Sequence, residues 1–262
     1  MKFISKTFIA LSLLATASLS LSAQNYTYID GYTLSTEGAE ATTQYGRVAG
    51  YIENGIFTFK GIPYAEAARY EEPHAPKAWT GVRSSRSYGP CCPQEFRSTW
   101  LMDNVGYTSR WDDGYPGEDC QRVNVWTPGV DGKKRPVMVW IHGGGFSTGS
   151  SQEQPAYDGA SLAKKGDVVV VSLNHRLNAL GFLNLSSFGP QFKHSANLGL
   201  LDIVEALKWV KNNVAYFGGD PDNVTYSVSR VAAARCPRSA VCPVQRASSR
   251  KPSWRVAQVL RS

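Results

Sequence analysis

Residues 137–225 alternate between strand-like and helix-like patterns, and this alternation restricts the fold more than any other feature of the chain. Residues 137–141 and 167–173 are mostly apolar runs of strand length, typical of strands covered on both faces of a sheet. A third strand is predicted to begin at residues 223–225. Strands separated by helices in this order predict an α/β fold with a largely parallel sheet.

Two helices are predicted between these strands. The first covers residues 158–165, with Asp158 as a candidate N-cap and Gly166 as the residue that stops it. The second covers residues 197–214, where apolar residues recur at helical spacing on one broad stripe.

Short strands are predicted upstream of this region. Residues 45–59 contain Asn54-Gly55, a dipeptide that favours the tight turn of a β-hairpin. Residues 123–126 are a further strand candidate, and residues 67–115 are predicted to be rich in loops.

Three consecutive glycines, Gly143, Gly144 and Gly145, follow the apolar run at 137–141 directly after His142. Glycine lets the backbone approach a ligand closely, and its N–H groups can then point at a developing oxyanion. His-Gly-Gly-Gly after a strand occurs in lipases and esterases. A tight glycine turn without a catalytic role is the alternative interpretation.

The first 23 residues have the three parts of a secretory signal peptide. Lys2 and Lys6 precede an uncharged run at 8–21, and small residues follow up to Ala23. A membrane span needs roughly 20 apolar residues, so cleavage near Ala23 is predicted; a buried or anchoring helix is the alternative. We expect a secreted or periplasmic protein, with no membrane span after cleavage, in a compartment that permits disulfides.

Five stretches of the chain, in one fixed order, resemble the type-B carboxylesterase and cholinesterase-like family of α/β-hydrolases. They are FKGIPYA (59–65), GEDC with NVWTP (117–128), VWIHGGGF (139–146), NHR with LGFL (174–183), and NLGLLD through FGGDPDNVT (197–225). The resemblance implies an incomplete α/β-hydrolase fold, with residues 24–225 as the N-terminal part of the domain. It also implies a serine esterase that hydrolyses a small-molecule carboxylic ester without a cofactor or metal.

The resemblance assigns roles to individual residues as well. Gly144 and Gly145 would donate backbone N–H groups to the oxyanion of the tetrahedral intermediate. Spacing alone leaves both Cys91 and Cys92 open as partners of Cys120. The resemblance implies a Cys92–Cys120 disulfide, because Cys92 stands in the Gly-Pro-x-Cys-Pro-Gln context of the family. At position 175 this chain has histidine, where the family usually has tyrosine.

The catalytic nucleophile expected from the resemblance is missing. In the family, a Gly-x-Ser-x-Gly elbow follows Asn-Val-Thr, and the acid and histidine come later in the chain. Here YSVSRVAAA follows Thr225, so we expect no esterase turnover from this chain. Ser147 lies in Gly-Phe-Ser-Thr-Gly, but inside the glycine-rich loop and without a predicted helix behind it, so we interpret it as a decoy. Every histidine precedes the expected elbow: His74, His142, His175 and His194.

The positive charge of the protein is concentrated in residues 226–262. This tail has eight Lys and Arg and no acidic residue, whereas residues 1–225 have 20 basic and 21 acidic residues, and the whole chain has a net charge of +7. We interpret the tail as the out-of-frame product of a frameshift that truncates the enzyme. Restoring one base before Tyr226 allows codons for Ile-Phe-Gly-Gln-Ser-Gly-Gly-Gly-Gly-Lys, which resembles the family's elbow. A second family-like stretch arises from residues 246–257 in the same way.

The tail is therefore predicted to be unstructured, with no nucleic-acid partner; a nucleic-acid-binding arm is the alternative. For the protein as a whole, the sequence predicts an exported carboxylic ester hydrolase with an incomplete catalytic apparatus. A non-catalytic cholinesterase-like binding domain and a nonfunctional truncated fragment are the two other hypotheses.

Overall fold

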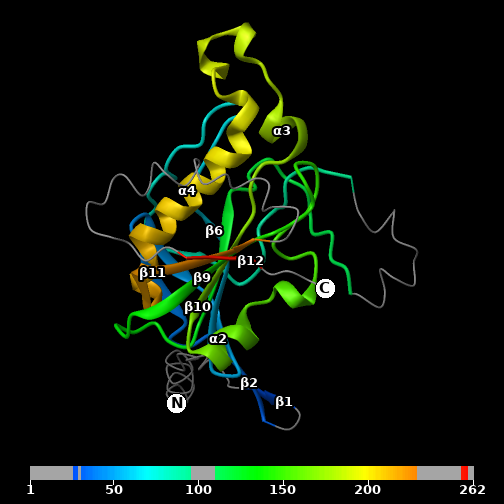
Figure 1. Ribbon diagram of the computed structural model, residues 1–262. Helices are drawn as coiled ribbons and strands as arrows, with labels where there is room; N and C mark the ends of the chain where they lie inside the picture. The colour runs from blue at the N-terminus through cyan, green and yellow to red at the C-terminus, as the bar shows by residue number, and fades with distance from the viewer. Residues whose placement is uncertain (1–25, 29–30, 96–109, 229–254, 259–262) are drawn as a thin grey trace, which may run out of the picture.

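The computed structural model describes residues 26–28, 31–95, 110–228 and 255–258 (Figure 1). The predicted signal peptide and most of the tail lie outside these residues. The central sheet has the strand order β1 (Tyr26–Tyr28), β2 (Tyr32–Ser35), β5 (Tyr51–Glu53), β6 (Ile56–Pro63), β8 (Arg122–Thr127), β10 (Val169–Leu173), β9 (Arg135–Ile141), β11 (Gly219–Val228) and β12 (Arg255–Gln258). A smaller sheet contains β3 (Glu40–Thr43), β4 (Gly46–Ala49) and β7 (Val82–Ser84).

The direction of strand pairing changes in the middle of the central sheet. β10, β9, β11 and β12 pair in parallel, whereas the neighbours from β1 to β10 pair antiparallel. Parallel neighbours need a crossover connection, and helices lie between β9 and β10 and between β10 and β11 in the chain. Parallel pairing is therefore confirmed for the predicted strands of this region. The sheet as a whole is mixed.

The predicted hairpin forms between β5 and β6. Glu53 pairs with Ile56 across the turn, and Asn54 and Gly55 have positive φ angles of 50° and 82°. Positive φ at both central residues is what a type I′ turn requires, and Asn and Gly tolerate it best. The predicted turn at Asn54-Gly55 is therefore confirmed.

The helices and helical turns of the described residues follow the strands in chain order. They are η2 (Pro155–Tyr157), α2 (Ala160–Gly166), α3 (Asn178–Phe182), η3 (Ser186–Phe188), η4 (Pro190–Phe192), η5 (Ser195–Asn197), α4 (Leu198–Asn213) and η6 (Val214–Phe217). No helix among the described residues is long and apolar enough to cross a membrane.

Helices α2 and α4 pack on opposite faces of the sheet (Figure 1). Val169 and Val171 of β10 belong to the main core with residues of α4, whereas Val170 packs with Ala163 of α2. Alternate residues of a strand point to opposite faces. The apolar run of β10 is therefore covered on both sides, as predicted.

The ends of α2 differ slightly from the prediction. The helix begins at Ala160 behind Gly159, and Asp158 accepts a hydrogen bond from the Ala160 N–H at 2.9 Å from just outside the helix. Gly166 is still helical, and Asp167 ends the helix with a left-handed φ of 45°. Both signals lie within one or two residues of the observed ends, the usual spread of helix boundaries.

β11 continues past residue 225, where we predicted the domain to end. Tyr226 and Ser227 pair with β9, and Tyr226 is buried in the main core beside Val224. Since Val224 and Tyr226 have the period-two spacing of a strand face, the strand pattern simply continues. The structure also places β12 within the tail that we predicted to be unstructured, parallel to β11.

The aromatic centre of the main core lies between the sheet and α4. Phe217 packs edge-on against Phe59 with ring centroids 5.2 Å apart, and against Trp209 at 5.9 Å. Gly218 then reverses the chain into β11 with φ 76°, and a Cβ there would lie 2.4 Å from the Gly129 carbonyl oxygen. The end of the helical segment is therefore enforced by backbone contact.

We expect Phe217→Ala to lower the free energy of unfolding by about 3–5 kcal/mol, because it removes a fully buried ring between two aromatic partners. The neighbouring Tyr216 is 47% exposed and is a matched control. Tyr216→Ala should cost under about 0.5 kcal/mol. Chemical denaturation followed by circular dichroism measures both, and equal losses would contradict this assignment of the core.

Candidate functional site

The glycine loop, residues 142–149, leaves the carboxyl end of β9. The parallel strands β10 and β11 flank β9, so their carboxyl ends lie at the same edge of the sheet. In open α/β sheets, ligands bind outside the carboxyl ends of the strands. The loop predicted to carry the oxyanion site therefore has the location that the fold favours for a site.

Backbone geometry requires glycine in this loop. Gly144 and Gly145 have φ angles of 100° and 65°, which L side chains rarely adopt. A Cβ on Gly144 would lie 2.0 Å from the Thr148 carbonyl oxygen. The turn is held by Thr148, whose N–H and Oγ1 both donate to the Gly144 carbonyl at 3.1 Å.

The N–H groups of Gly144 and Gly145 are available as donors. Neither makes a hydrogen bond to another residue within the described part of the chain. Two adjacent backbone donors in a glycine turn are the arrangement that can stabilise a developing oxyanion. The role of Gly144 and Gly145 as oxyanion donors stays a prediction.

Ser147 occupies an exposed turn at the tip of the loop. Its side chain makes no hydrogen bond to any described residue, and the next helical segment, η2, begins only at Pro155. A nucleophilic serine needs a base within hydrogen-bond reach. The interpretation of Ser147 as a decoy stays a prediction.

Two buried histidines stack beneath the loop. The rings of His142 and His175 are 4.8 Å apart and nearly parallel, at 11°. Their Nδ1 atoms lie 2.8 and 2.9 Å from the carbonyl oxygens of Gly143 and Arg176, so each Nδ1 carries the proton that is donated. The histidine that replaces the usual tyrosine at position 175 thus contacts the first residue of the glycine loop. The sequence identified the substitution but not this contact.

A buried ion pair fixes the chain just after the histidine stack. Arg176 donates to Asp202 through Nε at 2.9 Å and Nη2 at 2.8 Å, and the Arg176 backbone N–H adds a bond at 2.9 Å. Burial raises the pKa of the Asp202 carboxyl, and the bonds from Arg176 oppose this shift. The pair ties the segment after β10 to α4, and nothing in the sequence patterns pointed to it.

The structure brings Cys92 and Cys120 together but contains both as thiols. They are buried with Leu177, whose N–H donates to the Cys92 Sγ at 3.1 Å. The hydrogen bond with Cys120 lowers the pKa of the Cys92 thiol, while the same contact and burial raise the pKa of Cys120. Cys91 instead faces the carbonyl oxygens of Asp113 and Tyr115. The disulfide stays a prediction.

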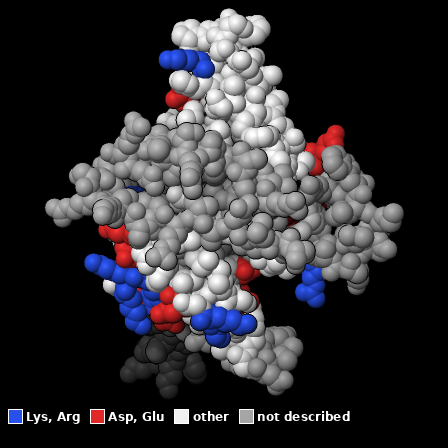
Figure 2. Space-filling model, in the orientation of Figure 1, with Lys and Arg blue, Asp and Glu red and all other residues white. Residues whose placement is uncertain are grey.

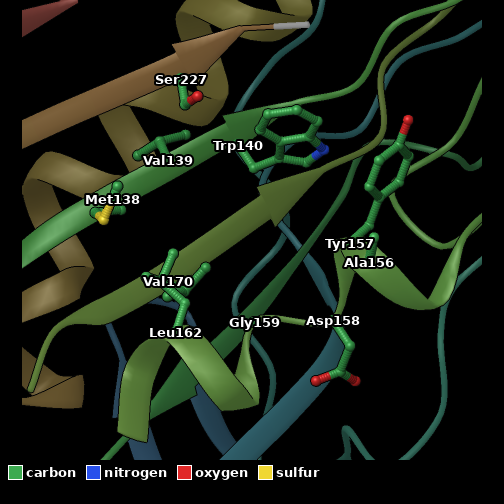
Figure 3. Close-up of a pocket in the computed structure, with 10 residues that line it drawn as sticks. All are labelled: Met138, Val139, Trp140, Ala156, Tyr157, Asp158, Gly159, Leu162, Val170 and Ser227. Atoms are coloured by element: carbon green, nitrogen blue, oxygen red, sulfur yellow. The ribbon is translucent and has the colours of Figure 1, made fainter. Parts of the chain in front are cut away.

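A cavity of about 300 Å³ lies on the α2 side of the sheet (Figure 3). Its lining is mainly apolar, and its residues include Met138, Trp140, Tyr157, Leu162, Val170 and Ser227. Trp140 Nε1 and Ser227 Oγ have no hydrogen-bond partner among the described residues, but both atoms are buried from solvent and therefore do not face the open space. The cavity offers no paired nucleophile and is separate from the glycine loop.

On the face shown in Figure 2, basic and acidic side chains of the described residues lie beside one another rather than in one basic surface. No group of three or more His, Cys, Asp or Glu among the described residues is placed to hold a metal ion.

Comparisons with known proteins agree with the resemblance seen in the sequence. The carboxylesterase family matches residues 37–234. The para-nitrobenzyl esterase of Bacillus subtilis is 50% identical over 188 residues, covering 70% of this chain and 36% of that protein. The phenmedipham hydrolase of Pseudarthrobacter oxydans is 43% identical over 193 residues, covering 71% of this chain and 36% of that protein.

Solved structures show the same relationship. An esterase from Clostridium hathewayi, described as hydrolysing aliphatic aromatic polyesters, superposes with a TM-score of 0.69 at 44% identity. The match covers 73% of this chain and 38% of that one, so this chain spans little more than a third of the length of these relatives. The family match includes the strands from β3 to β11, the glycine loop and α4. The chain therefore belongs to the carboxylesterase family and has the α/β-hydrolase fold.

Proposed function

We propose that this chain carries the oxyanion loop of an exported carboxylic ester hydrolase, with Gly144 and Gly145 as the donors. The observation that carries the proposal is a pair of N–H groups that bond to no described residue, in a turn where glycine is required, at the carboxyl end of β9. As the carbonyl carbon of an ester becomes tetrahedral, its oxygen gains negative charge. Two fixed N–H groups stabilise that charge more than they stabilise the neutral ester, which lowers the barrier.

The substrate class follows from the relatives. Two of them are named for hydrolysis of a para-nitrobenzyl ester and of phenmedipham, and a third is described as acting on polyesters. A small carboxylic ester is the substrate class we infer for this chain. The chemistry uses a serine nucleophile, a histidine base and an acid, and it calls for no metal or cofactor.

We infer that the chain as it stands does not turn over ester. After Thr225, where the family's elbow is expected, β11 continues through Tyr226 and Ser227. Ser227 is buried in the sheet and has no hydrogen-bond partner among the described residues, so no described base activates its hydroxyl. The residues YSVSRVAAA in place of the elbow support the frameshift interpretation, in which the missing base lies just before Tyr226.

Hydrolysis of a p-nitrophenyl acyl ester and labelling by a serine-directed fluorophosphonate test this proposal. We expect neither from this chain, and both from a version with the one base restored before Tyr226 and the downstream frame included. Resequencing the locus shows whether the base is absent from the gene. Turnover by the present chain that disappears in Ser147→Ala, but not in the matched exposed variant Ser186→Ala, would establish Ser147 as the nucleophile and overturn the proposal.

The predicted disulfide has a separate test that rests on export. We propose that signal cleavage after Ala23 exports the chain and that Cys92 then bonds to Cys120, which closes a loop worth about 3–4 kcal/mol. Mass spectrometry of non-reduced peptides from the exported protein should find this pair, with Gln24 at the N-terminus. Cys92→Ser should lower thermal stability under oxidising conditions, whereas Cys91→Ser should not. A Cys91–Cys120 peptide would contradict the assignment.

A further inference from the structure

The glycine loop closes on itself at Gly149. Gly149 has a φ angle of 111°. A Cβ on this residue would lie 2.3 Å from the Gly143 carbonyl oxygen and 2.6 Å from His142 Nδ1. One residue earlier, Thr148 donates its N–H to the Gly144 carbonyl at 3.1 Å. The backbone at the end of the loop therefore presses directly against its beginning. A shift of Gly149 moves the peptide groups that carry the candidate donors.

Gln94 holds Gly149 from outside the loop with both ends of its amide. Gln94 Oε1 accepts from the Gly149 N–H at 2.6 Å, and Gln94 Nε2 donates to the Gly149 carbonyl at 3.1 Å. The two residues are 55 positions apart in the chain. This side chain thus satisfies both backbone groups of one loop residue, as a neighbouring strand would.

Asn178 connects the Gln94 segment to the tip of the loop. Its Nδ2 donates to the Pro93 carbonyl at 2.6 Å, and its backbone N–H donates to the Phe146 carbonyl at 2.6 Å. One residue therefore fixes the position of Pro93 relative to the glycine turn.

Asn174 makes a comparable connection behind the loop. Its Nδ2 donates to the Pro90 carbonyl at 3.1 Å, and its Oδ1 accepts from the Ser151 N–H at 2.8 Å. The segment that leads into Gln94 is thus anchored at two points, Pro90 and Pro93. Because the backbone before Gln94 is fixed, the Gln94 side chain can hold Gly149 in place rather than move together with the loop.

We propose that Gln94 is a positioning residue for the oxyanion loop, because its amide fixes Gly149 and thereby the Gly144 and Gly145 N–H groups. The proposal rests on the oxyanion role inferred above. Gln94 itself contacts no reacting atom in this arrangement.

Gln94→Glu is the sharpest test, since it keeps the shape of the side chain and the acceptor but replaces the Nε2 donor. Above the carboxyl pKa, a carboxylate oxygen would face the Gly149 carbonyl and repel it. We expect the Gly149 amide of the full chain to exchange with solvent about tenfold faster or more. The amide NMR resonances of Gly144 and Gly145 should move with it.

Lowering the pH distinguishes the loss of this one hydrogen bond from a general disruption of the fold in Gln94→Glu. Below about pH 4.3 the introduced carboxyl gains a proton and regains a donor, so the loop resonances should return toward those of the parent. Gln191→Glu adds the same charge at an exposed residue and should leave the loop resonances unchanged at every pH. If Gln94→Glu does not fold, Gln94→Met removes both hydrogen bonds without a charge and should displace the same resonances.

Unmoved Gly144 and Gly145 resonances in a folded Gln94 variant would overturn the proposal, and so would a displacement that acid does not reverse in Gln94→Glu. The measurement needs no turnover. The NMR result can therefore be interpreted even if the chain belongs to no active esterase. In the same way, a negative NMR result does not affect the test of ester hydrolysis.

Discussion

Parallel pairing of β9 with both β10 and β11 is the constraint on which the rest of the structure depends. A strand with neighbours on both sides satisfies its backbone groups along its whole length, and its two faces must then be covered. Val137, Val139 and Ile141 enter the main core with α4, while Trp140 on the opposite face packs against Tyr157. The loop that follows β9 is therefore held at the carboxyl edge of the sheet.

Polar side chains then determine the shape of that loop. Gln94, Asn174 and Asn178 each bond to its backbone or to the residues just beyond it. Arg176 and Asp202 fix the adjoining segment to α4 through a buried pair. Buried polar groups need partners, so these contacts bring distant segments into one arrangement. These contacts hold the backbone of the loop in one shape.

Local patterns predicted much of the fold. The apolar runs gave strands β9 and β10, Asn54-Gly55 gave the hairpin turn, and the apolar stripe over 197–214 gave α4 together with the turn η6. The His-Gly-Gly-Gly motif pointed to the loop. Patterns could not predict the antiparallel half of the sheet, because strand direction there depends on pairing between segments. They also gave no sign that β11 continues beyond Thr225 or that β12 forms.

The sequence by itself determined the family, the order of the elements and the glycine residues of the loop, since these depend on local spacing and on steric limits at single positions. The absence of a nucleophile elbow after Thr225 is likewise readable from the residues alone. Only the tertiary structure decided which side chains support the loop: Gln94 lies 55 residues from Gly149, and His142 lies 33 residues from the ring that stacks on it. Contacts over such separations depend on how the sheet brings segments together, which no local pattern encodes.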